Sequence, residues 1–209
     1  MTYISIEGNI SAGKSTLLTY LEKEKKFQII KEPLNIWENF KGYNLLRLSY
    51  ENKAQYSFLF QNLVQLSMLK QHLSHKNRQM VIQERSYLST HQIFCQKFKQ
   101  DKTFSYLETE ILNEYFTFFA GQFEQQISPK KIIYLQTKPE VSFERIKYRN
   151  RGGENFISLE YVKSIHNLYE NWITKIKKEG NIKVLTVDAN QDKARIHNEY
   201  NKIIHFIEA

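Results

Sequence analysis

A glycine-rich segment directly behind a short apolar run constrains the fold more than any other part of this sequence. The segment GNISAGKST, residues 8–16, matches the pattern G-x-x-x-x-G-K-[ST] with Gly8, Gly13, Lys14 and Ser15. The preceding TYISIE alternates apolar and polar residues and predicts a buried strand, and the KSTLLTYLEKE that begins inside the motif predicts a helix. A strand that enters a helix through such a loop is typical of α/β proteins with a phosphate-binding loop.

This loop is suited to hold the phosphates of a nucleoside triphosphate such as ATP. Its glycines allow successive backbone N–H groups to face one anion, and the positive N-terminal end of the following helix points at the same anion. We expect Lys14 to reach the β- and γ-phosphates, Ser15 to offer a hydroxyl to Mg²⁺, and Thr16 to cap or pack against the first helical turn. A glycine turn with a chance lysine is the alternative, and the flanking strand and helix argue against it.

Short runs rich in Ile and Val alternate with longer segments of helical periodicity. The predicted strands are TYISIEG, FQIIKEP, QMVIQER, KIIYLQT and KVLTVDA. The predicted helices cover residues 14–26, 53–75, 86–99, 104–127, 139–151, 158–178 and 192–207. The alternation predicts an α/β fold in which a five-stranded parallel sheet is flanked by helices on both faces. Ligands of such sheets bind beyond the carboxyl ends of the strands.

Length, hydropathy and cysteine content favour one domain in a reducing compartment. With 209 residues, 41% of them hydrophobic, the chain can build a substantial core, and we expect a single domain over residues 1–209. No run approaches roughly eighteen apolar residues, and the N-terminus enters the first strand at once, so we expect no membrane partner and no signal peptide. Cys95 has no second cysteine to pair with and is expected to be a small buried hydrophobe in a cytoplasmic protein.

Charge distribution and ligand spacing argue against nucleic-acid binding and against a structural metal site. The net charge of +8 would suit a nucleic-acid partner, because Lys and Arg neutralise phosphates. The basic residues, however, form short clusters, EKEKK, PKK and KIKK, that are typical of solvated helix ends and turns, and we expect no nucleic-acid partner. The six histidines and one cysteine show no HExxH or CxxC spacing, so the only metal expected is the Mg²⁺ that accompanies ATP.

Charged residues follow the second and third predicted strands, at the sheet edge where the phosphate loop lies. Glu32 ends the second strand, and Glu84 and Arg85 end the third. A carboxylate buried there without a partner or a function would carry a large desolvation cost. For phosphoryl transfer, we expect Glu32 to act as the base toward a hydroxyl, Arg85 to hold that carboxylate, and Glu84 to join Mg²⁺ through water. The alternative for Glu32 is a surface acid in the turn before Pro33.

The segment ERIKYRNRGGE offers further positive charge for a phosphate ligand. It carries Arg145, Arg149 and Arg151 and ends at Gly152-Gly153. The spacings of four and two residues do not put all three arginines on one helix face, which suits a lid over about 145–155 that folds across the phosphates. An ordinary basic helix end is the alternative.

These motifs, in this order along nearly the whole chain, resemble the deoxynucleoside kinases, the group that contains the insect multisubstrate enzyme, mitochondrial thymidine kinase and deoxycytidine kinase. The resemblance rests on GNISAGKST, KEP followed by Trp37, Tyr50 with FQ at 60 and 61, ERS at 84–86, the arginine segment with Glu154, and VDA at 187–189. It implies the P-loop kinase fold, ATP-dependent phosphorylation of a deoxynucleoside 5′-hydroxyl in nucleotide salvage, and a homodimer built from amphipathic helices such as 53–75 and 104–127.

The resemblance also implies roles for individual residues. The catalytic residues it implies are Glu32 as base, Arg85 as its partner, Lys14, and the lid arginines Arg149 and Arg151. The substrate-binding residues it implies are Gln61 at the nucleobase edge, Phe94 stacked on the base, Trp37 as a pocket wall, and Tyr50 with Glu154 at the sugar 3′-hydroxyl. The ATP-binding residues it implies, in the phosphate loop, the lid and the DANQD segment at 188–192, are Gly8, Asn9, Ser11, Ala12, Gly13, Lys14, Ser15, Thr16, Arg145, Arg149, Asp188 and Asn190.

The pocket expected around Gln61 favours a pyrimidine nucleoside. An amide presents a donor and an acceptor together and can be turned over, so Gln61 can pair with thymine or with cytosine. The resemblance implies that relatives directed to deoxycytidine and purines carry an arginine and an aspartate deeper in the pocket. The corresponding places in this sequence look like Met68 and Thr90, with Val64 nearby. The uncharged pocket favours thymidine, with deoxycytidine second and purines last.

Two other functions fit part of the pattern. A nucleoside monophosphate kinase of the thymidylate type shares the phosphate loop, the acid–Pro turn and the acid–Arg pair, but it needs a further cationic seat for the substrate phosphate. Trp37, Tyr50 and Gln61 suit an uncharged nucleoside instead. A non-catalytic regulator that only senses ATP would need neither a base nor a lid.

Overall fold

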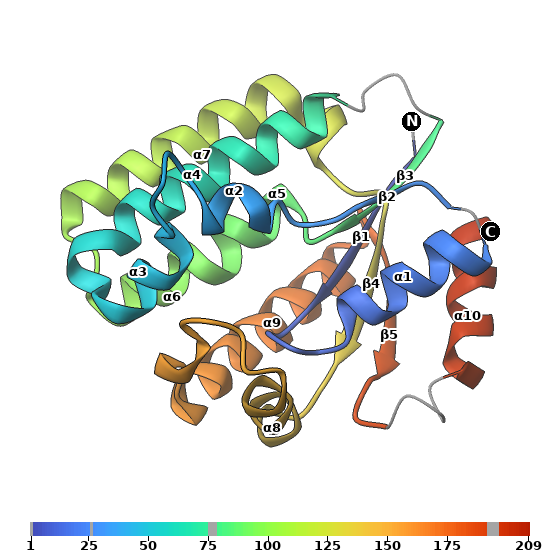
Figure 1. Ribbon diagram of the computed structural model, residues 1–209. Coiled ribbons are helices and arrows are strands. Elements are labelled where there is room, and N and C mark those ends of the chain that lie inside the picture. The colour runs from blue at the N-terminus through green and yellow to red at the C-terminus, as the bar shows by residue number, and fades with distance from the viewer. Residues whose placement is uncertain (1, 26, 75–78, 192–196) are drawn as a thin grey trace.

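The computed structural model describes residues 2–25, 27–74, 79–191 and 197–209, and these form a parallel sheet with helices on both sides (Figure 1). The strands in this described part are β1 (Thr2–Gly8), β2 (Ile29–Ile30), β3 (Met80–Glu84), β4 (Lys131–Gln136) and β5 (Lys183–Asp188). They lie in the order β2-β3-β1-β4-β5 and every neighbouring pair is parallel. The predicted five-stranded parallel sheet is therefore confirmed.

The position of β1 in the middle of the sheet explains its sequence. It pairs with β3 on one side and with β4 on the other, so both of its faces are covered and nearly all of its residues are buried. At the sheet edge, β2 is shorter than the predicted 27–33. Only Ile29 and Ile30 pair with β3, and the chain leaves the sheet before Pro33, which has no N–H to donate to a ladder.

The helices enclose this sheet and extend beyond one end of it. The helices of the described residues are α1 (Lys14–Glu24), α2 (Leu34–Glu38), α3 (Leu45–Glu51), α4 (Lys53–Ser74), α5 (Tyr87–Ser89), the π-helix η1 (Thr90–Cys95), α6 (Gln96–Gln100), α7 (Tyr106–Ile127), α8 (Pro139–Arg149), the 3₁₀-helix η2 (Glu154–Phe156), α9 (Leu159–Glu179) and α10 (His197–Glu208). In Figure 1, α4 and α7 run side by side away from the strands, while α1 and α10 lie on the opposite side.

Two differences from the predicted helices have simple causes. The predicted helix 86–99 is divided into α5, η1 and α6, because a π-turn shifts the apolar pattern by only one residue and the pattern cannot reveal it. The short helices α2 and α3 escaped prediction because five and seven residues are too few to show helical periodicity. Residues 192–196 of the predicted helix 192–207, and the last residues of the predicted helices 14–26 and 53–75, lie outside the described residues.

Two apolar clusters fix the layers on the faces of the sheet. On one face, Leu17, Leu18 and Leu21 of α1 meet Ile203 and Ile207 of α10. On the other face, the apolar side of α9 packs on β4 through the residues Val162, Ile165, Tyr169, Ile132 and Tyr134. Each fully buried aliphatic side chain of this kind stabilises the fold by about 1.5–3 kcal/mol, so both faces hold the strand ends in fixed positions.

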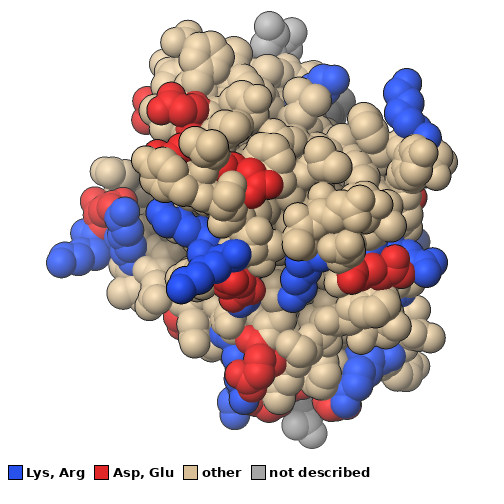
Figure 2. All heavy atoms as spheres, turned by 90° about the vertical axis from the view of Figure 1, so that its left-hand side faces the viewer, with Lys and Arg blue, Asp and Glu red and all other residues tan. Residues whose placement is uncertain are grey.

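The surface is mixed in charge. On the face shown in Figure 2, Lys and Arg side chains are interspersed with Asp, Glu and uncharged residues, and they form no continuous basic stripe there. Among the helices that the structure describes, none has the length and apolar character needed to cross a membrane.

A buried carboxylate connects β1 to the turn after β3. Glu7 is fully buried, and its Oε1 accepts hydrogen bonds from the backbone N–H of Ser86 (2.7 Å), the Ser86 hydroxyl (2.7 Å) and the Ser5 hydroxyl (2.6 Å). Its Oε2 accepts one from the Tyr169 hydroxyl of α9 at 3.1 Å. Because Ser86 also caps α5, one carboxylate holds the end of the phosphate-loop strand, the start of α5 and the middle of α9 together.

Replacing this carboxylate tests its structural weight. In Glu7→Gln, one acceptor oxygen becomes an NH₂ group that faces hydrogen-bond donors, so we expect the free energy of unfolding to fall by about 1–3 kcal/mol. Urea denaturation followed by circular dichroism measures the change. The exposed Glu160→Gln serves as the matched control and should stay within about 0.5 kcal/mol of the parent protein. Equal stability of the two variants would contradict the assignment.

Candidate active site

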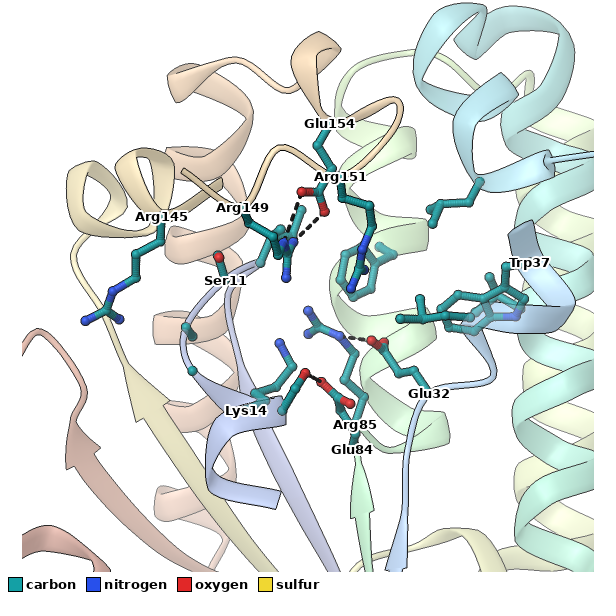
Figure 3. Close-up of a pocket in the computed structure, with 18 of the residues that line it drawn as sticks. Ser11, Lys14, Glu32, Trp37, Glu84, Arg85, Arg145, Arg149, Arg151 and Glu154 are labelled. Atoms are coloured by element: carbon teal, nitrogen blue, oxygen red, sulfur yellow. Dashed lines mark hydrogen bonds and ion pairs between the residues drawn. The ribbon is translucent and has the colours of Figure 1, made fainter. Parts of the chain in front are cut away.

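A cavity of about 430 Å³ opens at the carboxyl ends of β1, β2 and β3. Its walls come from the phosphate loop, from α2, α4 and η1, and from the arginine segment between α8 and η2 (Figure 3). The predicted site residues that line it are Ser11, Ala12, Gly13, Lys14, Ser15, Thr16, Glu32, Trp37, Tyr50, Gln61, Val64, Glu84, Arg85, Thr90, Phe94, Arg145, Arg149, Arg151 and Glu154. Residues far apart in the sequence therefore meet around one space.

The phosphate loop depends on two glycines. Gly8 has φ +149°, and a Cβ there would lie 2.8 Å from the carbonyl oxygen of Leu135, so only glycine fits beside β4. Gly13 has φ +97° and begins α1 in a left-handed conformation. These two positions turn the chain so that the first turn of α1 faces the cavity, as the motif predicts.

Lys14 is folded back onto its own loop. Its Nζ donates to the carbonyl oxygens of Asn9 (2.9 Å) and Gly8 (3.4 Å). Burial, followed by the nearby positive charge of Arg85, lowers the pKa of Lys14 to about 8. A phosphate anion in the cavity would stabilise the charged form of this amine, which is why the loop suits an anionic ligand.

Ser15 and Glu84 form a pair of oxygen ligands beside this lysine. The Ser15 hydroxyl donates to Glu84 Oε1 at 3.1 Å, and Glu84 is buried. In the part of the chain that the structure describes, no group of three or more His, Cys, Asp and Glu could hold a metal by itself. Two protein oxygens fit Mg²⁺ nevertheless, since this ion usually keeps several waters and takes further ligands from substrate phosphates.

Glu32 and Arg85 form the central ion pair of the cavity. Arg85 Nε donates to Glu32 Oε1 at 2.8 Å, and its Nη1 donates to the Gly8 carbonyl at 2.8 Å and to the Tyr169 hydroxyl. The guanidinium lies 4.8 Å above the ring of Phe94. Arg85 has φ +61°, an uncommon conformation for this residue type that is more frequent at functional sites.

The environment of Glu32 suits proton transfer. Burial raises the pKa of Glu32, and the positive charge of Arg85 offsets part of that rise. A carboxylate with a raised pKa binds a proton more readily than one in water, while its ion pair fixes where the oxygens point. This combination is typical of a general base.

The arginine segment contributes unequally to the cavity. In Figure 3, Arg149 and Arg151 point toward Lys14 and Arg85, whereas Arg145 points away from them. Arg145 donates to the backbone carbonyls of Ala189 (2.9 Å), Asn190 (3.3 Å) and Gln191 (2.9 Å), and so joins α8 to the loop after β5. That this segment moves as a lid stays a prediction.

Arg149 and Glu154 are paired with each other across the segment. Arg149 Nε donates to Glu154 Oε2 at 3.1 Å, and its second nitrogen contacts Oε1. Between them, Asn150 ends α8 with φ +47°, and Gly153 adopts φ +88° against Arg47, where a Cβ would lie 3.0 Å from the Arg47 side chain. The tight turn brings the buried Glu154 back over the cavity.

The other half of the cavity is mainly apolar. Trp37, Val64 and Phe94 surround it, and the indole N–H of Trp37 donates to the Ser67 hydroxyl at 2.8 Å. Gln61 is a buried amide in this wall. Tyr50 lies at the boundary near Glu154, and burial, together with the charge of Glu154, raises the pKa of Tyr50 above its usual value. The shape fits a flat, largely uncharged group with a few polar edges.

Five predicted residues lie behind the cavity wall. Gly8 and Asn9 begin the phosphate loop, and Asn9 Nδ2 ties it to α9 by donating to the Val162 carbonyl at 2.9 Å. Met68 is fully buried in the apolar cluster around α4. Asp188 and Asn190 bond to one another at 2.6 Å in the loop after β5, where Asn190 Oδ1 also accepts from the Lys138 N–H at 2.7 Å. Asp192 of the DANQD segment lies outside the described residues.

Several residues that shape the site were not predicted. Glu7 and Tyr169 position Arg85, and Tyr161 lines the cavity. A charged residue inside a strand predicted to be buried was the available signal for Glu7. Tyr161 and Tyr169 gave no signal, because they continue the apolar face of α9 and look like core residues.

The pKa of Lys14 gives a testable pH dependence. Binding of a triphosphate favours the protonated amine, so affinity for a non-hydrolysable ATP analogue should fall as the pH rises from 7.5 to 9 through the Lys14 pKa of about 8. Calorimetry measures this affinity. In Lys14→Met, binding should be weaker and its fall over the same range should flatten. An equally steep fall in the variant would contradict the role of Lys14.

The model of the deoxynucleoside kinase family matches residues 4–209. The chain is 33% identical over 172 residues to mitochondrial thymidine kinase 2 of Homo sapiens, an alignment that covers 82% of this chain and 64% of that protein. It is 30% identical over 234 residues to deoxycytidine kinase of Homo sapiens (98% of this chain, 90% of the relative).

A third relative is the mitochondrial deoxyguanosine kinase of Xenopus laevis, which is 29% identical over 216 residues. That alignment covers 90% of this chain and 82% of the relative. The chain spans less than two thirds of thymidine kinase 2 and most of the other two relatives. With a family match over nearly all its residues, the chain belongs to the deoxynucleoside kinase family.

Proposed function

We propose that the protein transfers the γ-phosphoryl group of ATP to the 5′-hydroxyl of a deoxynucleoside. The observation that carries this proposal is the ion pair between Glu32 and Arg85, 2.8 Å apart, in the same cavity as the phosphate loop. A base held beside a triphosphate site is what phosphoryl transfer to an alcohol needs. Family membership supports a nucleoside as the second substrate.

The reaction follows from the positions of these residues. Glu32 takes the proton of the 5′-hydroxyl while the 5′-oxygen forms a bond to the γ-phosphorus. The bond from that phosphorus to the oxygen bridging the β- and γ-phosphates breaks, and ADP leaves with the bonding pair. Lys14, Arg149 and Arg151 neutralise the charge on the phosphoryl oxygens, and Arg85 keeps the Glu32 carboxylate aimed at the hydroxyl.

Ser15 and Glu84 are the residues that would hold Mg²⁺. When bound, this ion would offset the negative charge of the triphosphate. The Ser15 hydroxyl would be a direct ligand, and the Glu84 carboxylate, whose Oε1 accepts the Ser15 hydrogen bond at 3.1 Å, would reach the ion through water.

The apolar half of the cavity supports a pyrimidine nucleoside. Gln61 offers hydrogen bonds to the base edge, Phe94 and Trp37 offer faces to the ring, and Tyr50 with Glu154 offers partners to the 3′-hydroxyl. Neither Val64 nor Thr90 brings a charge to this wall. We infer that thymidine is the preferred substrate and deoxycytidine the second. The relatives named for thymidine, deoxycytidine and deoxyguanosine show that base choice varies within the family.

A substrate panel tests the proposal. With ATP and Mg²⁺, we expect transfer to thymidine first, deoxycytidine second and deoxyguanosine last, measured as kcat/KM for each. In Glu32→Gln, kcat should fall by about 10²–10⁴-fold because the base is lost. Glu160→Gln is the exposed control and should retain the parent activity. Transfer to thymidine monophosphate alone would indicate a monophosphate kinase, and transfer to no acceptor would indicate an ATP-binding regulator.

We also propose that α4 and α7 pair two copies of the chain. An apolar groove of about 700 Å³ lies between α4, α7 and the segment that leads into α3. Leu59, Leu66 and Tyr115 line it and are exposed, and Phe118 is a further exposed residue of α7. Monomers seldom expose so many large apolar side chains on one face. A second copy is the occupant that suits it best, because a two-fold axis lets identical helices cover each other.

Charge inserted in this face should separate the copies. We expect the parent protein to elute with twice the 25.1 kDa chain mass in size-exclusion chromatography with light scattering, and Leu66→Glu to elute as a monomer. Tyr148→Glu changes an exposed aromatic residue of α8 and should leave the mass unchanged. A parent protein that is monomeric at micromolar concentration would refute the pairing.

A further inference from the structure

Behind the cavity wall, Gln61 is joined to a series of hydrogen-bonded buried side chains. The amide oxygen Oε1 of Gln61 accepts a hydrogen bond from the Cys95 thiol, with 3.7 Å between sulfur and oxygen. The same sulfur accepts from Gln65 Nε2 at 3.6 Å, and Gln65 Oε1 accepts from the Tyr87 hydroxyl at 3.1 Å. All four side chains are buried.

This series of hydrogen bonds has one donor-to-acceptor direction. Tyr87 is fully buried, and its hydroxyl has no hydrogen-bond partner among the described residues other than Gln65 Oε1. If Gln65 turned over, the phenol proton would have no acceptor, so the nitrogen end of Gln65 faces the sulfur. Burial raises the pKa of Cys95 to about 12, and the sulfur therefore keeps its proton and donates it to Gln61. Each group thus donates to the next, and such chains strengthen their members.

This direction favours one orientation of the Gln61 amide. If the amide turned over, its NH₂ group would face a sulfur that already accepts from Gln65, and the thiol proton would lose its acceptor. In the favoured orientation, Gln61 Nε2 forms no hydrogen bond with the described part of the chain, and it is left for a ligand of the cavity that Gln61 lines.

The π-helix explains why a cysteine reaches this position. Within η1, Thr90 and Phe94 line the cavity, while the adjacent Cys95 lies on the side of Gln61 and Gln65. A π-turn carries one more residue than an α-turn, and such turns are rare and concentrated at functional sites. Here it lets one short helix supply both the cavity wall and the group behind Gln61.

We propose that Cys95, supported by Gln65 and Tyr87, is a positioning residue that fixes the Gln61 amide and thereby sets the discrimination between thymine and cytosine. The inference rests on the proposed nucleoside substrate. Thymine presents a ring N–H donor beside a carbonyl acceptor, whereas cytosine presents a ring acceptor beside an amino donor. One amide orientation matches one base, and the reverse orientation matches the other. An amide that cannot turn over is therefore selective.

Breaking the hydrogen bonds behind Gln61 should weaken that selectivity. Cys95→Val has a similar volume and no hydrogen-bonding group, and Tyr87→Phe removes the far end of the chain without touching the cavity. In both variants, we expect the ratio of the thymidine and deoxycytidine dissociation constants to move toward one by about threefold or more, since one hydrogen bond sets the amide. The affinity for the ATP analogue should stay unchanged.

Tyr134→Phe is the matched control, because Tyr134 is a buried tyrosine whose hydroxyl donates to Glu170 at 2.7 Å in another part of the fold. Its ratio should equal that of the parent. Unchanged ratios in Cys95→Val and Tyr87→Phe, or an equal change in Tyr134→Phe, would overturn the inference.

The readout separates this inference from the proposed function. Calorimetric binding of the two nucleosides does not need phosphoryl transfer, which is measured on the parent protein in parallel. A parent that binds the nucleosides without transferring phosphate would refute the kinase proposal and still test Cys95. A parent that binds neither nucleoside would overturn both.

Discussion

The buried carboxylate of Glu7 is the interaction on which the rest of the site depends. It receives hydrogen bonds from Ser5, from the backbone and hydroxyl of Ser86, and from Tyr169. Without these donors, the desolvation free energy of a buried carboxylate would strongly destabilise the fold. With them, the strand that enters the phosphate loop, the turn that carries Arg85 and the middle of α9 have one fixed arrangement, and Glu32 takes its position from Arg85.

The cavity is rich in charge, and several of its charged groups are already paired. Arg85 holds Glu32, Arg149 holds Glu154, and Lys14 is bonded to two carbonyls of its own loop. Because buried charges are tolerated only when paired, these contacts keep the cavity stable before any ligand arrives. They also fix the directions in which these side chains point, and a side chain that is already held in place loses less conformational freedom when a ligand binds.

Most of the fold could be predicted from the sequence, because parallel strands covered on both faces appear as short Ile- and Val-rich runs and the phosphate loop fixes the first turn. The site was predictable where residues follow strand ends, as Glu32 and Arg85 do. The supporting contacts were not. The bonds from Glu7 to Ser86 and to Tyr169 join residues 79 and 162 positions apart, and neither partner has a local pattern that reveals the other. The link between Cys95 and Gln61 likewise depends on a π-turn that periodicity cannot show.

The ion pair between Arg149 and Glu154 couples the charges of the two halves of the cavity. Under the proposed function, the arginine serves the phosphate donor and the carboxylate serves the sugar, yet here each is the counter-ion of the other. A ligand that engages one of them changes the charge that the other must neutralise. By linkage, whatever the first substrate adds to or subtracts from the affinity of the second is returned equally in the opposite order. Under the proposed function, the short turn between α8 and η2 would therefore couple the affinities for donor and acceptor through this ion pair, in addition to any contact between the two substrates.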